Sequence, residues 1–104
     1  MVTVQRLSPQ SFLIKNEKMW SSIVINPTTI IEDVDVVILT HRSSLNVTLE
    51  MLLQKSRKNL KIVTFGKLHD DITKLGVNQF KLVRLDCMFR QYFKYIEILR
   101  VETD

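Results

Sequence analysis

The sequence predicts an α/β (α+β) fold, a mixed β-sheet with two helices packed on one face, and three observations lead to it. Hydrophobic residues make up 45% and charged residues 25% of the 104 positions, which is typical of an ordered globular chain. Short apolar segments of strand length alternate with two segments of helical periodicity. The apolar segment 34–40 ends in a polar turn that opens a helix, as strands do in layered α/β proteins. The length predicts a single domain over residues 1–104.

The N-terminal part of the chain predicts three short strands. Residues 1–7 and 11–16 have strand character and are separated by the turn Ser8-Pro9-Gln10. A third strand is expected from Trp20 to Ile25 and ends before Pro27, because proline has no N–H for a strand ladder. Local pairing of these three strands gives an antiparallel meander.

Residues 34–40 predict a strand buried on both faces, since apolar residues run without interruption from Val36 to Leu39. The turn that follows contains short polar side chains suited to cap a helix N-terminus. The candidates for this cap are Ser43, Ser44 and Asn46. The helix itself is predicted from leucines at helical spacing, which place one apolar face against the sheet: Leu45, Leu49, Leu52 and Leu53.

The C-terminal half predicts one more helix between strands. A strand is expected at 60–65, followed by a short helix from His69 to Leu75 that stops at Gly76. Two further strands, at 79–85 and 92–101, are expected to pair as a final hairpin. The order along the chain is then strands, helix, strand, helix, strands, which is an α/β layering.

The positive charge is unevenly distributed along the chain. The formal net charge is +4 and the pI about 9.4, which permits contact with nucleic acid without requiring it. Between Glu50 and Asp70 there is no acidic residue, and the basic residues there include Lys55, Arg57, Lys58, Lys61 and Lys67. They are interpreted first as a solvated helix end, whose dipole they offset, and second as a nucleic-acid-binding surface.

Cysteine content and hydropathy predict a chain of the reducing cytoplasm. Cys87 has no second cysteine to pair with, so no internal disulfide is expected. Uninterrupted apolar runs are too short for a membrane helix, so no membrane contact is expected. The N-terminal segment also lacks the charged-then-apolar layout of a signal peptide.

Several short motifs follow one another in a particular order. Leu7-Ser8-Pro9-Gln10-Ser11-Phe12 comes first, and Ile25-Asn26-Pro27 follows at the end of a strand. Thr40-His41-Arg42-Ser43-Ser44-Leu45-Asn46 opens the first helix, and Leu75-Gly76-Val77 follows the second. In this order the motifs resemble the N-terminal half of the metallo-β-lactamase fold, closest to a branch of predicted metal-dependent hydrolases related to ascorbate-phosphate lactonase. The resemblance implies half of an αββα sandwich.

The resemblance also implies that this chain has lost the metal ligands of the family. The family motif is Thr-His-x-His-x-Asp-His, in which imidazoles and a carboxylate bind the metal. His41 alone keeps a ligand-type side chain, while Ser43, Leu45 and Asn46 occupy the other ligand positions. Asn26 stands where the family has a supporting aspartate. No metal, no cofactor and no catalytic residue is therefore expected.

Two other groups of side chains have residue types that are used in catalysis or metal binding. His41 could act as a general base, because imidazole titrates near neutrality, but a residual histidine hydrogen-bonded to backbone is the favoured interpretation. His69-Asp70-Asp71 could be a metal cluster, but the favoured interpretation is a helix start, where acidic side chains complement the dipole.

A chain that forms half of an αββα sandwich is expected to need a partner chain. Exposing the inner face of its sheet would be unfavourable by about 25 cal/mol per Å². We therefore expect a homodimer through the open sheet face, or a hetero-partner that supplies the missing half. The expected function is non-catalytic protein-protein interaction or assembly. The alternatives are a nucleic-acid-binding accessory protein that uses the basic residues, and a residual metal-dependent hydrolase whose ligands a partner chain completes.

Overall fold

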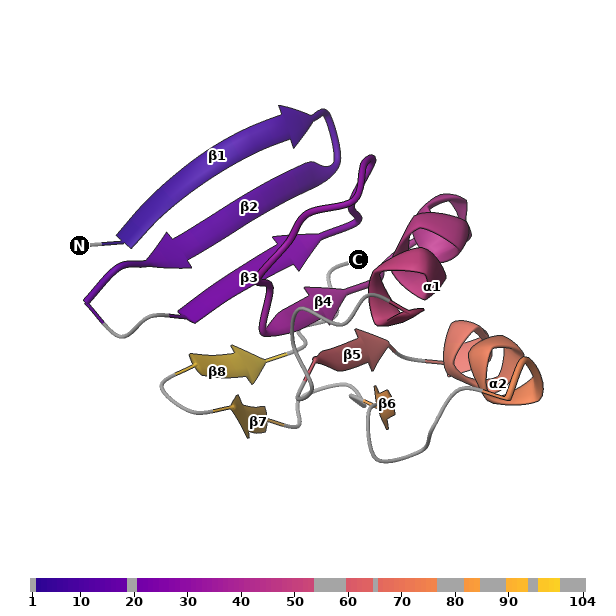
Figure 1. The fold of residues 1–104 in the computed structure, drawn as a ribbon. Coiled ribbons are helices and arrows are strands. Elements are labelled where there is room, and N and C mark those ends of the chain that lie inside the picture. The colour runs from indigo at the N-terminus through magenta and orange to yellow at the C-terminus, as the bar shows by residue number, and fades with distance from the viewer. Residues whose placement is uncertain are drawn as a thin grey trace.

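A six-stranded sheet with helices on one side forms the main body of the molecule (Figure 1). The computed structural model describes residues 2–18, 21–53, 60–64, 66–76, 82–84, 90–93 and 96–99. The strands of this sheet lie side by side in chain order from β1 to β6, and β7 and β8 form a separate two-stranded sheet. The predicted α/β class, with a mixed sheet and two helices on one face, is confirmed.

The N-terminal strands form the predicted antiparallel meander. β1 (Val2–Ser8) pairs with β2 (Ser11–Asn16), and β2 pairs with β3 (Ser21–Ile25). Pro9 and Gln10 form the tight turn between the first two strands, where proline presets the backbone angle of a turn. Strand boundaries from the sequence agree with the structure here, because the turn and the alternation of side chains are both local signals.

The remaining strands of the main sheet run parallel to β3. β4 (Val36–Ile38) pairs with β3, β5 (Lys61–Thr64) pairs with β4, and β6 (Leu82–Arg84) pairs with β5. Parallel neighbours need crossover connections, and helices provide the last two of these. The carboxyl ends of β3, β4, β5 and β6 therefore lie at the same edge of the sheet. β4 is shorter than the predicted 34–40.

A 3-10 turn and two helices cover one face of the sheet. The turn η1 (Arg42–Ser44) leads directly into α1 (Leu45–Leu53), and α2 (Gly66–Lys74) follows β5. α2 begins at Gly66 rather than at His69. Gly66 has a positive φ of 59° at this helix start, a conformation that a residue without Cβ tolerates. Gly76, with φ 82°, lies just beyond the helix as predicted, and its N–H donates to the carbonyl of Thr73 at 3.1 Å.

The earlier start of α2 corrects the interpretation of His69-Asp70-Asp71. These residues lie in the middle of α2, and the first turn of the helix holds no acidic side chain. The predicted interaction of the two aspartates with the positive end of the helix dipole is therefore wrong. Asp71 instead forms an ion pair with Arg42 of η1, with 3.1 Å between Oδ2 and Nη1.

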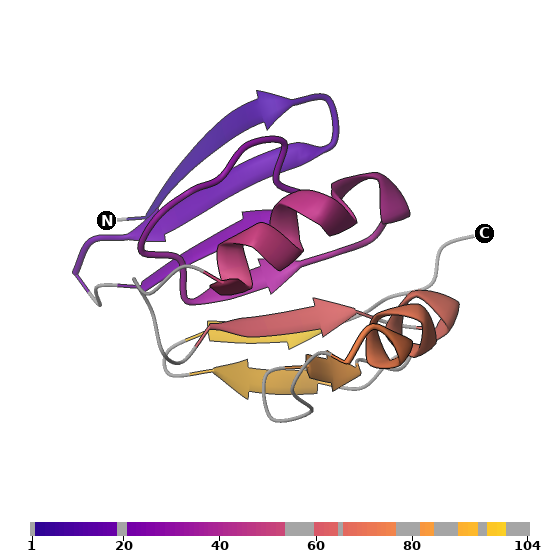
Figure 2. The same cartoon turned by 45° about the vertical axis from the view of Figure 1, so that its right-hand side comes forward.

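The C-terminal strands differ from the prediction. The expected hairpin of 79–85 with 92–101 is wrong, because β6 pairs with β5 in the main sheet. The hairpin is formed instead by β7 (Arg90–Phe93) and β8 (Ile96–Leu99), which pair antiparallel. Figures 1 and 2 show this hairpin beside β5, on the side of the sheet opposite to the helices.

Apolar side chains are buried on both faces of the central strands. Val24 and Val37 belong to the core cluster on the helix side, together with Ile72 of α2. Ile23 and Val36 alternate with them and form a second cluster with Val63 on the other face. The sheet is thus a middle layer with apolar packing on both of its sides. Among the described residues, no helix is long and apolar enough to cross a membrane.

Ile72→Ala should lower the free energy of unfolding by about 2–5 kcal/mol, because removal of a buried branched side chain leaves a cavity. Ile72 is 0% exposed and ties α2 to the helix-side core. Urea denaturation followed by circular dichroism measures the change. Leu75→Ala is the matched control: Leu75 is 57% exposed, and its truncation should change stability by less than about 0.5 kcal/mol. Equal losses in the two variants would contradict this placement of α2.

Candidate functional site

The edge of the sheet at the carboxyl ends of β3 and β4 contains the loop that the sequence singled out. In open α/β sheets, ligands usually bind at this edge. Asn26 follows β3, and Thr40 and His41 follow β4. Because β2 runs antiparallel to β3, the turn that precedes β2 brings Gln10 to the same edge.

A hydrogen-bond network centred on Asn26 joins these segments. Asn26 is 5% exposed, and its backbone N–H donates to the carbonyl of Ile38 at 2.9 Å. Its side-chain Oδ1 accepts from the backbone N–H of Thr40 at 2.9 Å. Its Nδ2 donates to the carbonyl of Gln10 at 3.2 Å and to Oγ1 of Thr40 at 2.6 Å. One carboxamide therefore holds the β1–β2 turn and the end of β4 together.

The chemistry of this network requires an amide at position 26. The N–H of Thr40 needs an acceptor, and the carbonyl of Gln10 needs a donor, so both ends of the carboxamide are fixed in orientation. Asn26 also has a positive φ of 48°, a conformation that asparagine adopts more readily than most residues. An aspartate here would place a carboxylate against the carbonyl of Gln10. Asn26 therefore has a structural role of its own, in addition to lacking the charge that an aspartate would supply.

His41 is the one imidazole at this edge, and it is exposed to solvent. Its Nδ1 lies 2.6 Å from Oγ1 of Thr40, the hydroxyl that also accepts a hydrogen bond from Asn26. The predicted hydrogen bond from His41 to backbone is thus replaced by one to a side chain. The imidazole precedes η1 and makes no side-chain capping bond to it. The network orients His41 through Thr40, but brings no acid to its ring.

The other positions of the metal motif do not converge on His41. Ser43 and Asn46 are exposed, whereas Leu45 is 8% exposed and packs in the helix-side core. Consecutive residues of a helical segment point in different directions, which explains this divergence. Throughout the described part of the chain, no group of three or more His, Cys, Asp or Glu side chains could hold a metal ion.

The basic residues are described only in part. Lys55, Arg57 and Lys58 lie outside the described residues. Lys61 is the first residue of β5, and Lys67 is exposed in the first turn of α2, beyond the other end of that strand. The length of β5 therefore separates the two lysines, and they do not form one patch.

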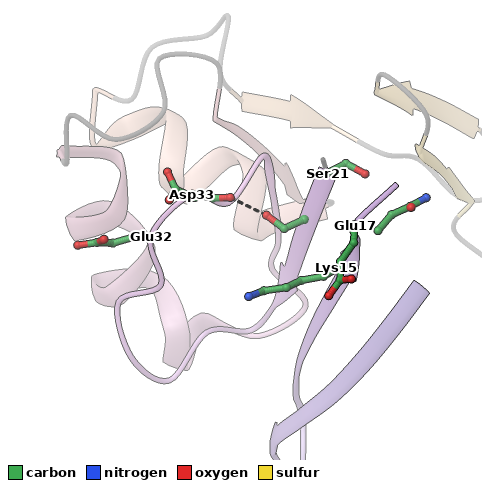
Figure 3. A pocket seen from close by; sticks show the side chains of 7 residues that line it. Lys15, Glu17, Ser21, Glu32 and Asp33 are labelled. Atoms are coloured by element: carbon green, nitrogen blue, oxygen red, sulfur yellow. Dashed lines mark hydrogen bonds between the residues drawn. The ribbon is translucent and has the colours of Figure 1, made fainter. Parts of the chain in front are cut away.

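A pocket of about 310 Å³ lies at the opposite edge of the sheet, where β2 ends and β3 begins (Figure 3). Its lining residues are Lys15, Asn16, Glu17, Ser21, Ser22, Glu32 and Asp33. Asp33 has a positive φ of 59°, and its carbonyl accepts a hydrogen bond from Oγ of Ser22 at 2.7 Å, the dashed line of Figure 3. The N–H of Ser22 in turn donates to Oδ2 of Asp35 at 2.9 Å. These bonds fix the loop before β4 against β3.

Sequence reasoning missed the roles of Thr40 and Gln10. The available signal was an asparagine at a strand end, since asparagine tolerates the left-handed conformation and its side chain readily bonds to backbone. Its partners are distant in the sequence, so the pattern alone could not identify them.

Comparisons with protein-family models, curated proteins and solved structures found no match for this chain.

Asn26→Asp should lower the free energy of unfolding at pH 7 by about 3 kcal/mol, because a buried carboxylate would oppose the Gln10 carbonyl and leave it without a donor. The difference from the original chain should shrink at acidic pH, where a protonated carboxyl can donate again. Chemical denaturation at both pH values measures this.

Asn46→Asp is the control, since it makes the same chemical change at an exposed position in the first turn of α1. Its effect should stay within about 0.5 kcal/mol, and any effect should be stabilising at the helix N-terminus. A fully stable Asn26→Asp variant would show that the amide donor does not matter.

Proposed function

We propose that this chain is a metal-free relative of the metallo-β-lactamase fold that acts by non-catalytic contact with other protein chains, and first of all with a second copy of itself. The residue types at the candidate site support the non-catalytic part. Leucine cannot bind a metal, and the side chain of Leu45 is buried in the helix-side core. The carboxamide of Asn26 is fully engaged in structural hydrogen bonds. Among the described residues, no metal-binding group of side chains includes His41, and no ion pair joins it to an acid for general base chemistry.

The observation that carries the proposal is the exposure of β1. Residues Val2–Arg6 are exposed without interruption, which includes side chains on both faces of the sheet. Val2 and Val4 are 59% and 63% exposed, more than any other large apolar side chain of the described residues. They share a face with Ile14, which lies opposite Val4 in the strand register. Neighbouring exposed valines on one face of a strand offer an apolar surface for contact with another chain.

The structure also narrows the surface that such a contact can use. The open face expected from the sequence is already covered at the central strands, since Val36 and Val63 are 1% and 0% exposed within one chain. The β7–β8 hairpin lies on that side of the sheet, beside β5 (Figure 2). β1 is at the other end of the strand order, far from the hairpin. The proposed contact therefore involves β1 rather than the whole inner face.

Analytical ultracentrifugation over a wide concentration range tests the proposal. We expect a reversible rise from the mass of one chain, 12.2 kDa, to that of two chains. Addition of EDTA or of zinc should leave the association unchanged, because no metal takes part in it. A chain that stays monomeric up to about millimolar concentration, the limit of weak association, would contradict self-assembly. Stoichiometric binding of zinc would contradict the metal-free assignment.

A further inference from the structure

The outer edge of β1 has unused hydrogen-bonding capacity. β1 is the terminal strand of the six-stranded sheet and pairs with β2 on one side only. Its other edge has no strand neighbour among the described residues, so a row of backbone N–H and C=O groups faces outward. β1 is also the longest strand of the sheet, with 7 residues. Such an edge is a template for strand addition unless something protects it.

β1 carries little of the usual protection of an edge strand, and what it has, Arg6 and the irregular ladder between Arg6 and Ser8, lies at one end. Natural edges carry lysines, prolines or inward-pointing charges that prevent pairing with another chain. Val2–Ser8 contains neither lysine nor proline, and its only charge is Arg6. The guanidinium of Arg6 folds back on its own turn, where Nε donates to the carbonyl of Ser8 at 3.3 Å and Nη2 to that of Pro9 at 3.5 Å. The one charge of the strand is thus engaged by its own turn.

From this weakly protected edge we infer that β1 pairs antiparallel with β1 of a second copy, about a two-fold axis perpendicular to the sheet. The inference rests on the proposed self-assembly and specifies its interface. Each sheet would continue into the other, which satisfies the outward backbone groups of both strands. β1 is the edge strand at the end of the sheet away from α2 and the β7–β8 hairpin, so these elements leave room for the second copy (Figure 1).

The structure also selects the register of this pairing. The ladder between β1 and β2 is irregular between Arg6 and Ser8, so the regular, exposed part of the strand is Val2–Arg6. Its centre is Val4. A two-fold axis at Val4 places Val4 opposite Val4 of the second copy, Thr3 opposite Gln5, and Val2 opposite Arg6. A perpendicular two-fold keeps each face of one sheet continuous with the same face of the other.

The pairs formed in this register suit a second copy of the chain. Val4 meets an identical β-branched side chain, and Thr3 meets a polar side chain, both of which are favourable cross-strand neighbours. The aliphatic stem of Arg6 lies beside Val2, and the two arginines are not opposite each other. A closed two-fold arrangement needs only this self-complementary edge. A pair of short strands buries less area than a standard stable interface, so we expect a weak, reversible dimer.

Disulfide trapping in the full chain tests the register. In a Cys87→Ser background, Val4→Cys places two thiols opposite each other at the axis, whereas Val2→Cys is equally exposed but places its thiols about 13 Å apart. Under mild oxidation, Val4→Cys should form a covalent dimer at least about tenfold faster than Val2→Cys, because a disulfide requires Cβ atoms within about 4.5 Å. A mixture of Val2→Cys and Arg6→Cys chains should form the mixed dimer in preference to either homodimer.

Val4→Lys gives a second readout that does not depend on cysteine. Two lysines opposite each other at the axis should weaken dimerisation at least about tenfold, since like charges directly opposite are destabilising. Leu75→Lys changes another exposed apolar residue, distant from β1, and should leave dimerisation unchanged. A dimer in ultracentrifugation together with equal trapping of Val4→Cys and Val2→Cys would overturn the edge pairing but leave the proposed assembly. A chain that is only monomeric would overturn both.

Discussion

Burial of the central strands on both faces is the constraint on which the rest of this structure depends. Val24 and Val37 face the helices, while Ile23 and Val36 face the opposite side, and all four are buried. Strands of this kind favour apolar side chains along their length, because a buried polar group without a hydrogen-bond partner is costly. Polar side chains therefore gather at the edges of the sheet where strands end. Surfaces for contact with other chains are available on strands that neither the helices nor the β7–β8 hairpin cover.

Both consequences are visible in the molecule. At the carboxyl edge, where open α/β sheets commonly hold ligands, the carboxamide of Asn26 bonds to Gln10 and Thr40. Both N–H donors of this carboxamide are used within the chain, so it has no donor left for a substrate. At the other extreme of the strand order, residues Val2–Arg6 of β1 are exposed, and only the end of the strand packs on the helix-side core through Leu7. The fold thus combines a structurally engaged candidate site with an open edge, which favours a role in assembly.

The sequence predicted those features of the fold that depend on local patterns. The meander, the helix after the polar turn and the glycine after α2 follow from alternation, periodicity and backbone freedom over a few residues. The start of α2 at Gly66 was missed because glycine is a poor helix former and favours a turn. The pairing of β6 with β5 rather than in a terminal hairpin is decided by contacts distant in sequence. For the same reason the Asn26–Thr40 bonds and the bare faces of β1 could not be predicted.

We propose that this protein contacts other chains through the backbone edge of β1. Amide hydrogen exchange, measured at concentrations far below and far above the dimerisation constant, tests it most directly. Strand addition predicts that alternate amides of Val2–Arg6, those that point away from β2, become protected only at high concentration. Amides of the central strands should be protected at both concentrations. Unchanged exchange in β1 alongside new protection elsewhere would contradict the account.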